Sequence, residues 1–493
     1  MNVPRLFKQS AIRTVAMVIV KVIGLIGRII LTRIVGAEGI GLYQIAYSFF
    51  GFVLMLTGGL PTTLAIVTAK KPAQGWQFLK LVSVCAILTS GIISLVVFRH
   101  SSSIANLLGN PDLEYAIRGL APALFAVPLL SLLRGYLQGL ERISIIALSE
   151  VTEQAFRIFF LLLIVSQLLP LGVNGAVGRG MYATFIGAFA SFSLLTLYIY
   201  LDKTSSPRSS HPTPYLPLMW FLKSSLMISL TRIFIPASEF IDAILVPNRL
   251  LAAGYSTSEA TAMYGVIYGM AAIVVYTPTL ITGALSHTVT VQIAAEWQQG
   301  NLKKFNRLTQ MALKVSWLWG LASALFLFLY ANELSLFIFN TENARYAIRY
   351  LAGIPLIVGF REISTSILWS QDNKKTPLFG LLSGLVCSIL AQYFLVRIPG
   401  FGYIGASIAI ILMEFVSSAW NFKALQKSKK KISDLLHLIM DVGFLSGIII
   451  GISRLSPSMG DLAISLRQFL IETFLFFIVT GVYIYWRCVR YKK

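Results

Sequence analysis

The sequence predicts an all-α protein that crosses a membrane about fourteen times, in two six-helix lobes followed by two more helices. Apolar residues make up 56% of the 493 residues and charged residues only 12%, whereas a soluble protein typically has about 25% charged residues. Many stretches reach the roughly 20 apolar residues that a helix needs to span a bilayer. Patterns in the first half of the chain also recur in the second half.

The apolar runs give the positions of the expected spans. They lie at 11–34, 40–68, 77–98, 112–139, 143–168, 174–201, 219–247, 259–295, 305–330, 345–370, 376–397, 402–424, 434–453 and 464–487. The stretch "DKTSSPRSSHPTPYLP" at 202–217 is rich in Ser and Pro and therefore predicts a linker. We expect an N-terminal lobe at 1–201, a cytoplasmic linker at 202–218, a C-terminal lobe at 219–424, and the last two helices with a basic tail at 425–493.

Three pairs of matching stretches predict that the two lobes are repeats. "EGIGLYQIAYSFFGFV" from Glu38 and "EATAMYGVIYGMAAIV" from Glu259 share Glu, four residues, Tyr, three residues and Tyr. "LFKQS" matches "FLKSS", and "EYAIRGLAPALFAVP" matches "RYAIRYLAGIPLIVG", in the same order along the chain. Six spans in each copy give both copies the same orientation. Such repeats are typical of transporters with a substrate path at the repeat interface, and we expect Tyr43 and Tyr264 to be equivalent.

The net charge of +21 is explained by the membrane better than by nucleic acid. Lys and Arg gather in the loops predicted to be cytoplasmic, including "KALQKSKKK" at 423–431, so both termini are expected in the cytoplasm. The three cysteines form no close pair, and the four histidines form no HExxH motif. A P-loop is also missing from the sequence, so we expect a protein that is not an enzyme and does not hydrolyse ATP.

Charged residues inside the expected spans predict a cationic cavity. Lys21 and Arg28 are seven residues apart and share one helix face, and Arg157 lies roughly 21 Å into its span at 1.5 Å per residue. An ionised side chain at the bilayer centre costs at least about 2.5–3.5 kcal/mol. The cations predicted to line a water-filled cavity for an anion such as pyrophosphate are Lys21, Arg28, Arg134, Arg157 and Arg232.

A structural interpretation of the same charges stays open. Glu153 and Arg157 have the spacing of a helix salt bridge, and Arg134 near a span end could extend to the interface. The residues expected to balance the cations or to couple to an ion are Glu150, Glu153, Glu239, Asp242, Arg361 and Glu362. Gly24 and Gly27 would allow another helix or a ligand to approach closely.

Prolines inside the expected spans predict bends. Proline kinks a helix, and bent helices are common where transporters gate, although a static kink is an equally good explanation for any one of them. The predicted hinges are Pro61, Pro236 and Pro278.

Several stretches resemble a known family. "GLIGRIILTRIVGAEGIGLY" at 24–43 resembles the polysaccharide flippase branch of the multidrug/oligosaccharidyl-lipid/polysaccharide exporter superfamily. "LRGYLQG" at 133–139 and "SEVTEQAFRI" at 149–158 are similar to the stage V sporulation protein B group within it, as are "EATAMYG" and "LITGALSHTVTVQIAAEWQQGN". The resemblance covers nearly the whole chain and is weaker beyond residue 360, where "ILWSQDNKK" departs from the glycine-rich turn of the family.

The resemblance implies alternating access in the cell membrane, with a lipid-linked saccharide such as lipid II moved from the inner to the outer leaflet. It also implies a link to spore cortex peptidoglycan, and Arg28, Arg134 and Arg157 match charged positions of the family motifs. The expected partners are the saccharide lipid and the bilayer, with cell-wall synthases left open. No cofactor is expected, and coupling to Na⁺, to H⁺ or to the membrane potential is left open. The alternatives are a multidrug exporter of the same superfamily and a membrane scaffold for cell-wall synthesis.

We predict that Arg28→Ala abolishes transport while the protein stays folded and inserted. A diphosphate that enters a low-dielectric cavity loses hydration and needs fixed cations in exchange. Arg28→Lys should keep part of the activity, because only arginine binds phosphate oxygens in pairs, and Arg28→Glu should keep none. The measurement is complementation of a flippase-deficient strain beside abundance in the membrane. Full complementation by Arg28→Ala would refute the role of substrate anchor.

Overall fold

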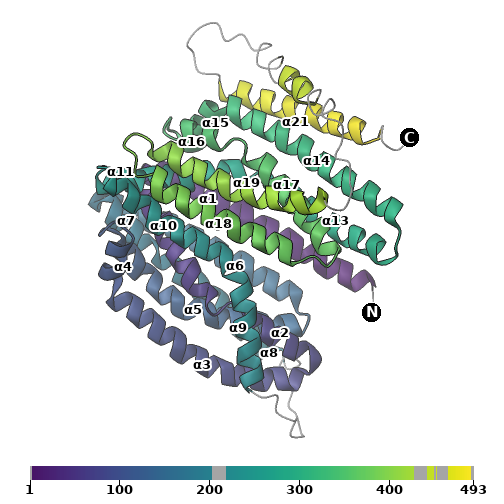
Figure 1. Cartoon of the computed structure of the whole chain (residues 1–493). Helices are drawn as coiled ribbons and strands as arrows, with labels where there is room; N and C mark the ends of the chain where they lie inside the picture. The colour runs from purple at the N-terminus through teal and green to yellow at the C-terminus, as the bar shows by residue number, and fades with distance from the viewer. Residues whose placement is uncertain (1–2, 203–217, 427–440, 449–450, 452–464, 490–493) are drawn as a thin grey trace. The chain divides into compact units, whose positions relative to one another are not determined.

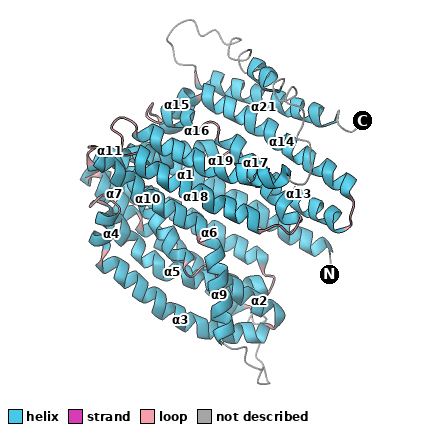
Figure 2. Ribbon diagram, viewed as in Figure 1, coloured by secondary structure: helices cyan, strands magenta, loops and turns pink. Residues whose placement is uncertain are grey.

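The protein consists of helices joined by loops and turns in the part of the chain that the structure, a computed structural model, describes: residues 3–202, 218–426, 441–448, 451 and 465–489 (Figure 2). Within these residues eleven helices are long and apolar enough to span a membrane, or twelve if a bent helix pair counts as one span. The all-α, multi-pass prediction is therefore confirmed, but the count of fourteen is not. The predicted span at 434–453 lies mostly outside the described residues.

The described helices fall into two compact units. Unit 1 comprises residues 1–251 and 255–265, and unit 2 comprises residues 252–254 and 266–493. The predicted lobe boundaries at 201 and 219 stay a prediction, since these units divide the chain further along. The pairing of the two lobes as repeats also stays a prediction.

Unit 1 contains the helices labelled first along the chain (Figure 1). They are α1 (Val3–Met55), α2 (Leu60–Lys70), α3 (Pro72–Arg99), α4 (Ser101–Leu107), α5 (Leu113–Gly139), α6 (Ile143–Leu168), η1 (Leu169–Leu171), α7 (Val173–Gly180), α8 (Tyr182–Leu201), α9 (Leu218–Arg232), α10 (Phe234–Ala252) and α11 (Thr257–Tyr264).

Unit 2 contains most of the π-helix η3, which begins at the last residue of unit 1, and the helices that follow it. They are η3 (Gly265–Ala271), α12 (Ala272–Tyr276), α13 (Thr279–Gln298), α14 (Leu302–Leu329), α15 (Ala331–Phe339), α16 (Arg345–Leu351), α17 (Ile354–Ser370), α18 (Lys375–Leu395), α19 (Gly402–Gln426) and α21 (Leu466–Val489).

Helix α1 joins the first two predicted spans. The 60 residues Ala11–Lys70 form one stretch that is long and apolar enough to span a membrane. At 1.5 Å per residue they would cover about 90 Å, far more than one bilayer core. The chain bends at Gly36, where φ is 69° and ψ is −166°, a conformation that glycine adopts without the clash of a Cβ. The span predicted at 40–68 is interrupted by a turn at 56–59, and α2 then begins at Leu60.

All three predicted hinge prolines lie at or beside a break between helices. Pro61 is the second residue of α2, and Pro278 precedes α13 directly. Pro236 lies in the first turn of α10, just after the 54° bend between α9 and α10. A proline there cannot donate to the carbonyl group four residues before it, that of Arg232, which accounts for the bend. The predicted long eighth span is accordingly divided into α11, η3, α12 and α13, and movement at these breaks stays a prediction.

Glycines bring α1 against its neighbours within unit 1. A Cβ on Gly24 would lie 2.6 Å from the Nε2 atom of Gln154, and one on Gly27 would lie 2.4 Å from Ile158. Both contacts are with α6, so the close helix approach expected at these two glycines is confirmed. Further along α1, a Cβ on Gly41 would lie 2.1 Å from the carbonyl oxygen of Thr261 on α11.

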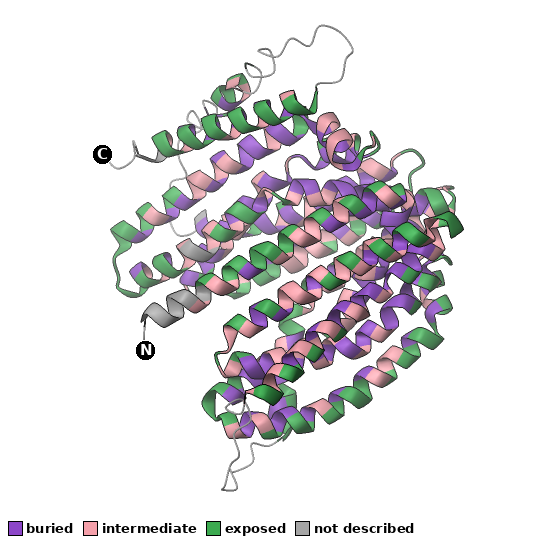
Figure 3. Ribbon diagram, turned by 180° about the vertical axis from the view of Figure 1, so that it is seen from behind, coloured by how far each residue is buried: buried purple, intermediate pink, exposed green. Residues whose placement is uncertain are grey.

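The outward surface of the helices is apolar, as a lipid environment requires. Exposed residues alternate with buried ones along the helices (Figure 3). On α3 a stripe of exposed apolar side chains recurs every three or four residues, namely Leu81, Val84, Leu88, Ile92 and Leu95. Such spacing places them on one face of the helix, and this face is suited to contact hydrocarbon.

We predict that Gly41→Ala destabilises the protein by about 1–3 kcal/mol, since the new methyl group meets backbone that can move only together with its helix. The matched control is Gly51→Ala on the same helix, where a Cβ would meet nothing within 4 Å. Both substitutions gain the same helix propensity. Thermal unfolding in detergent should show Gly41→Ala below wild type and Gly51→Ala not below it. Equal melting temperatures would contradict this prediction.

Candidate functional site

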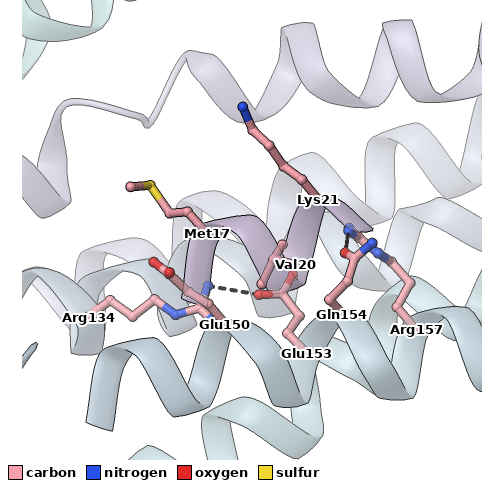
Figure 4. Close-up of a pocket in the computed structure, with 8 residues that line it drawn as sticks. All are labelled: Met17, Val20, Lys21, Arg134, Glu150, Glu153, Gln154 and Arg157. Atoms are coloured by element: carbon pink, nitrogen blue, oxygen red, sulfur yellow. Dashed lines mark hydrogen bonds and ion pairs between the residues drawn. The ribbon is translucent and has the colours of Figure 1, made fainter. Parts of the chain in front are cut away.

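A cavity of about 250 Å³, lined mainly by charged and polar residues, lies in unit 1 between α1, α5 and α6 (Figure 4). Eight side chains line it: Met17, Val20, Lys21, Arg134, Glu150, Glu153, Gln154 and Arg157. Three of the five predicted cations and two of the predicted acidic residues therefore meet at one place.

Helix periodicity explains why these side chains share the cavity. On α6 the four lining residues stand at 150, 153, 154 and 157, and on α1 the three stand at 17, 20 and 21. Residues three, four and seven apart lie on the same face of a helix. Gly24 lets these two faces approach, because it leaves room for the side chain of Gln154.

Arg134 is held in an ion pair. Its Nη1 atom lies 2.8 Å from the Oε2 atom of Glu153, with the two side chains only 19% and 15% exposed. Its Nε atom donates to the hydroxyl of Ser149 at 2.9 Å. Glu153 thus forms its ion pair with Arg134, and not with Arg157 as the helix spacing suggested. The positive charge of Arg134 is largely cancelled within the protein.

Arg157 has neutral partners instead. It donates to the side-chain oxygen of Gln154 and also hydrogen bonds to Tyr47. No carboxylate among the described residues forms an ion pair with its guanidinium, and Glu153 acts on it only by longer-range electrostatics. Its Nε atom is buried without a hydrogen-bond partner in the described part of the chain. The positive charge of Arg157 therefore remains available to a ligand in the cavity.

Arg28 lies near this group but does not line the cavity. Its guanidinium donates to the side-chain oxygen of Gln44 and stands 5.9 Å from the centre of the Tyr43 ring. The Tyr43 ring is in turn 4.5 Å from the ring of Tyr47. Since Tyr43 interacts electrostatically with both Arg28 and Arg157, the two arginines both lie near this tyrosine pair.

The remaining two charges of the cavity are Lys21 and Glu150. Lys21 is exposed, and in Figure 4 its side chain extends away from the Arg134–Glu153 pair. Glu150 is half-buried. With Arg134 and Glu153 cancelling each other, Lys21 and Arg157 outweigh Glu150, and the lining carries a net positive charge.

The other predicted site residues lie outside this cavity. Arg232 is exposed, and its Nη1 atom donates to the hydroxyl of Thr62 at 3.0 Å, beside the start of α2. Glu239 on α10 interacts electrostatically with Arg28. Asp242, also on α10, acts in the same way on Tyr264.

The last two predicted site residues belong to unit 2. Arg361 pairs with Glu414 at 2.5 Å, and Glu362 accepts a hydrogen bond of 2.9 Å from the hydroxyl of Thr282. The roles assigned to all these residues stay predictions. Within the described residues no three His, Cys, Asp or Glu side chains are arranged to hold a metal ion.

Sequence reasoning missed Gln44, Gln154 and Tyr47. Neutral amides and phenols carry no signal in a search for charges, and Gln154 stands directly beside the charged Glu153. Helix spacing could have found Gln154, which is three residues before Arg157 and therefore on the same face. Tyr47 was visible as the second tyrosine of the repeated pattern.

Comparison of sequences relates the chain to a family of polysaccharide biosynthesis proteins. Residues 6–285, more than half of the chain, match the family described as polysaccharide biosynthesis protein. Stage V sporulation protein B of Bacillus subtilis is 26% identical over 415 residues, covering 82% of this chain and 80% of that protein. Lipid II flippase MurJ of the same organism is 22% identical over 467 residues, with 86% and 85% covered.

Solved structures share the fold. An inward-facing multidrug resistance transporter of the MATE family in the MOP superfamily superposes with a TM-score of 0.68 at 16% identity, over 86% of this chain and 95% of that one. A MOP superfamily transporter from Pyrococcus furiosus, described as having a binding pocket of reverse polarity, gives 0.56 at 16% identity, over 87% and 96%. From the family match we conclude that this chain, a multi-pass membrane protein with a transporter fold, belongs to the polysaccharide biosynthesis protein family.

Proposed function

We propose that the protein is a flippase that moves a lipid-linked saccharide, a peptidoglycan precursor such as lipid II, from the inner to the outer leaflet. The observation that carries this proposal is Arg157, a cation in a net positive cavity whose hydrogen-bond partners are neutral. A diphosphate headgroup needs such a cation when it leaves water. The relatives support the cargo, since one is a lipid II flippase and another a sporulation protein.

The residues of the cavity have different roles in binding the headgroup. The planar guanidinium of Arg157 can donate to two phosphate oxygens at once, while Lys21 supplies a mobile charge at the rim. The ion pair of Arg134 with Glu153 fixes α5 to α6 and holds the wall of the cavity in place. Release then follows when alternating access exposes the headgroup to water, and a coupling ion or the membrane potential would set the direction.

The location of the protein follows from the same proposal. The basic loops orient both termini toward the cytoplasm, so the headgroup would enter the cavity from the leaflet where it is made. A role in spore cortex synthesis rests on the relatives that are sporulation proteins. A cation-exporting multidrug pump is less suited, because the net positive lining repels cationic drugs.

We predict that purified protein in liposomes flips a fluorescent lipid-linked saccharide diphosphate, and that Arg157→Ala reduces the rate at least about tenfold, the effect of 1.4 kcal/mol of lost binding in the flipping step. The rate is measured from protection of the fluorophore against a membrane-impermeant quencher. The matched control is Arg118→Ala on α5, whose guanidinium pairs with Glu114 outside the cavity and which should flip at the wild-type rate.

A second assay in the same liposomes distinguishes the exporter. Wild-type protein that moves a cationic dye and leaves the lipid-linked saccharide in place would refute the flippase. A protein that binds but moves neither compound would favour the membrane scaffold.

A further inference from the structure

We infer that Gln154 is a positioning residue that sets the sign of the cargo, by holding Arg157 with a neutral amide where a carboxylate would cancel its charge. This inference rests on the proposed function and adds to it a residue that determines specificity. The same arrangement recurs at Arg28, whose guanidinium donates to the amide oxygen of Gln44. At Arg157 this arrangement fixes the direction of the guanidinium and keeps its charge.

The neighbouring arginine provides the contrast within one cavity. Arg134 and Arg157 both line it, and their partners Glu153 and Gln154 are consecutive residues of α6. Glu153 accepts from Arg134 with a charged carboxylate, and Gln154 accepts from Arg157 with an uncharged amide. Glu and Gln are nearly identical in size and shape, so the difference between the two pairs is one unit of charge.

Packing holds Gln154 in its place. The residue is only 6% exposed, and it fits against Gly24 of α1, where a Cβ would come within 2.6 Å of its Nε2 atom. Gly187 of α8 also lets the backbone of α6 approach, because a Cβ on this glycine would lie 3.0 Å from the Cβ of Arg157. A buried amide fixed in this way has few other conformations, so its oxygen stays directed at the guanidinium.

The tyrosine pair completes the arrangement. Tyr47 shares a hydrogen bond with Thr184 of α8 and also bonds to Arg157. Its ring packs against Tyr43, over which Arg28 stands. Arg157, held by an amide and a phenol, and Lys21 in the same lining form a site for a ligand with more than one negative charge, which a diphosphate ester of a lipid provides.

Exchanges of Glu and Gln test the inference directly. The full-length chain in detergent is titrated with farnesyl diphosphate as the probe, and thermal unfolding is recorded for each variant. Gln154→Glu keeps the acceptor and strengthens its bond to Arg157, so we expect an unchanged or higher melting temperature together with at least about tenfold weaker binding. If Gln154 had only a structural role, the affinity for the probe would fall only in variants whose melting temperature also falls.

The reciprocal variant should act in the opposite direction. Glu153→Gln converts the Arg134 pair into a neutral-amide pair of the same shape, and we expect at least about threefold tighter binding of the probe, because the cavity gains one net positive charge. Unchanged or weaker binding in this variant would contradict the claim that carboxylate or amide decides the charge that a ligand meets.

A third variant moves Gln154 without altering it. Gly24→Ala places a methyl group against the flexible end of the Gln154 side chain, so the helices need not move. We expect several-fold weaker binding, while Gly51→Ala on the same helix, in open space, should bind as wild type. If Gln154→Glu does not fold, the affinities of Gly24→Ala and Gly51→Ala test the positioning role of Gln154 instead.

The outcomes separate this inference from the proposed function. Wild-type protein that does not bind the probe would refute the diphosphate cargo itself. Wild-type binding with a Gln154→Glu variant of equal affinity would overturn the positioning role and leave the flippase standing. Equal affinities of Gly24→Ala and Gly51→Ala would overturn the positioning role in the same way.

Discussion

A charge placed among apolar helices must find its partners within the protein, because hydrocarbon offers none. Some of the charged groups described between the helices follow this constraint in the simplest manner, by pairing with the opposite charge. Arg134 pairs with Glu153 in unit 1, and Arg361 pairs with Glu414 in unit 2. Such pairs connect helices and add little net charge. Arg157 meets the same constraint with an amide and a phenol, and this difference is the reason why we propose that it binds the ligand.

The cavity depends on helix contacts that only small residues permit. Gly24 and Gly27 on α1 bring the backbone of that helix to the side chains of α6, and the polar faces of both helices then meet. A helix pair held apart by larger residues would leave the polar groups of α6 facing an apolar gap. The cavity with its charged residues and the glycine contacts are therefore two consequences of one packing arrangement.

Much of the fold could be predicted from hydropathy, and for a physical reason. The length of an apolar run is set by the bilayer, so α5 and α6 agree with the predicted spans 112–139 and 143–168 to within one residue. The breaks were harder to place, because apolar composition continues across them. The turn at 56–59 and the π-helix η3 interrupt runs that hydropathy reads as single spans. Pro61 indicated the turn, and Pro278 indicated the break before α13 but not η3.

The sequence predicted which charged residues lie at the site, but not which of them form ion pairs with one another. Helix periodicity brought Glu150, Glu153 and Arg157 onto one face, and the structure places all three at the cavity. The same periodicity also suggested an ion pair between Glu153 and Arg157. Which ion pair forms depends on which residue of another helix lies against this face of α6. The carboxylate of Glu153 pairs with Arg134 on α5. Contacts between helices that are distant in sequence are not encoded in the spacing along one of them.

Exchange of a carboxylate for an amide beside an arginine offers a simple route by which one transporter fold could change the charge of its cargo. The two residues have nearly equal volumes, so the helices need not repack. An arginine paired with Glu contributes shape and no net charge, and the same arginine beside Gln contributes a full positive charge at the same position. In this chain the two states stand next to each other at Glu153 and Gln154. The sign of the cavity can therefore be set without altering the fold that encloses it.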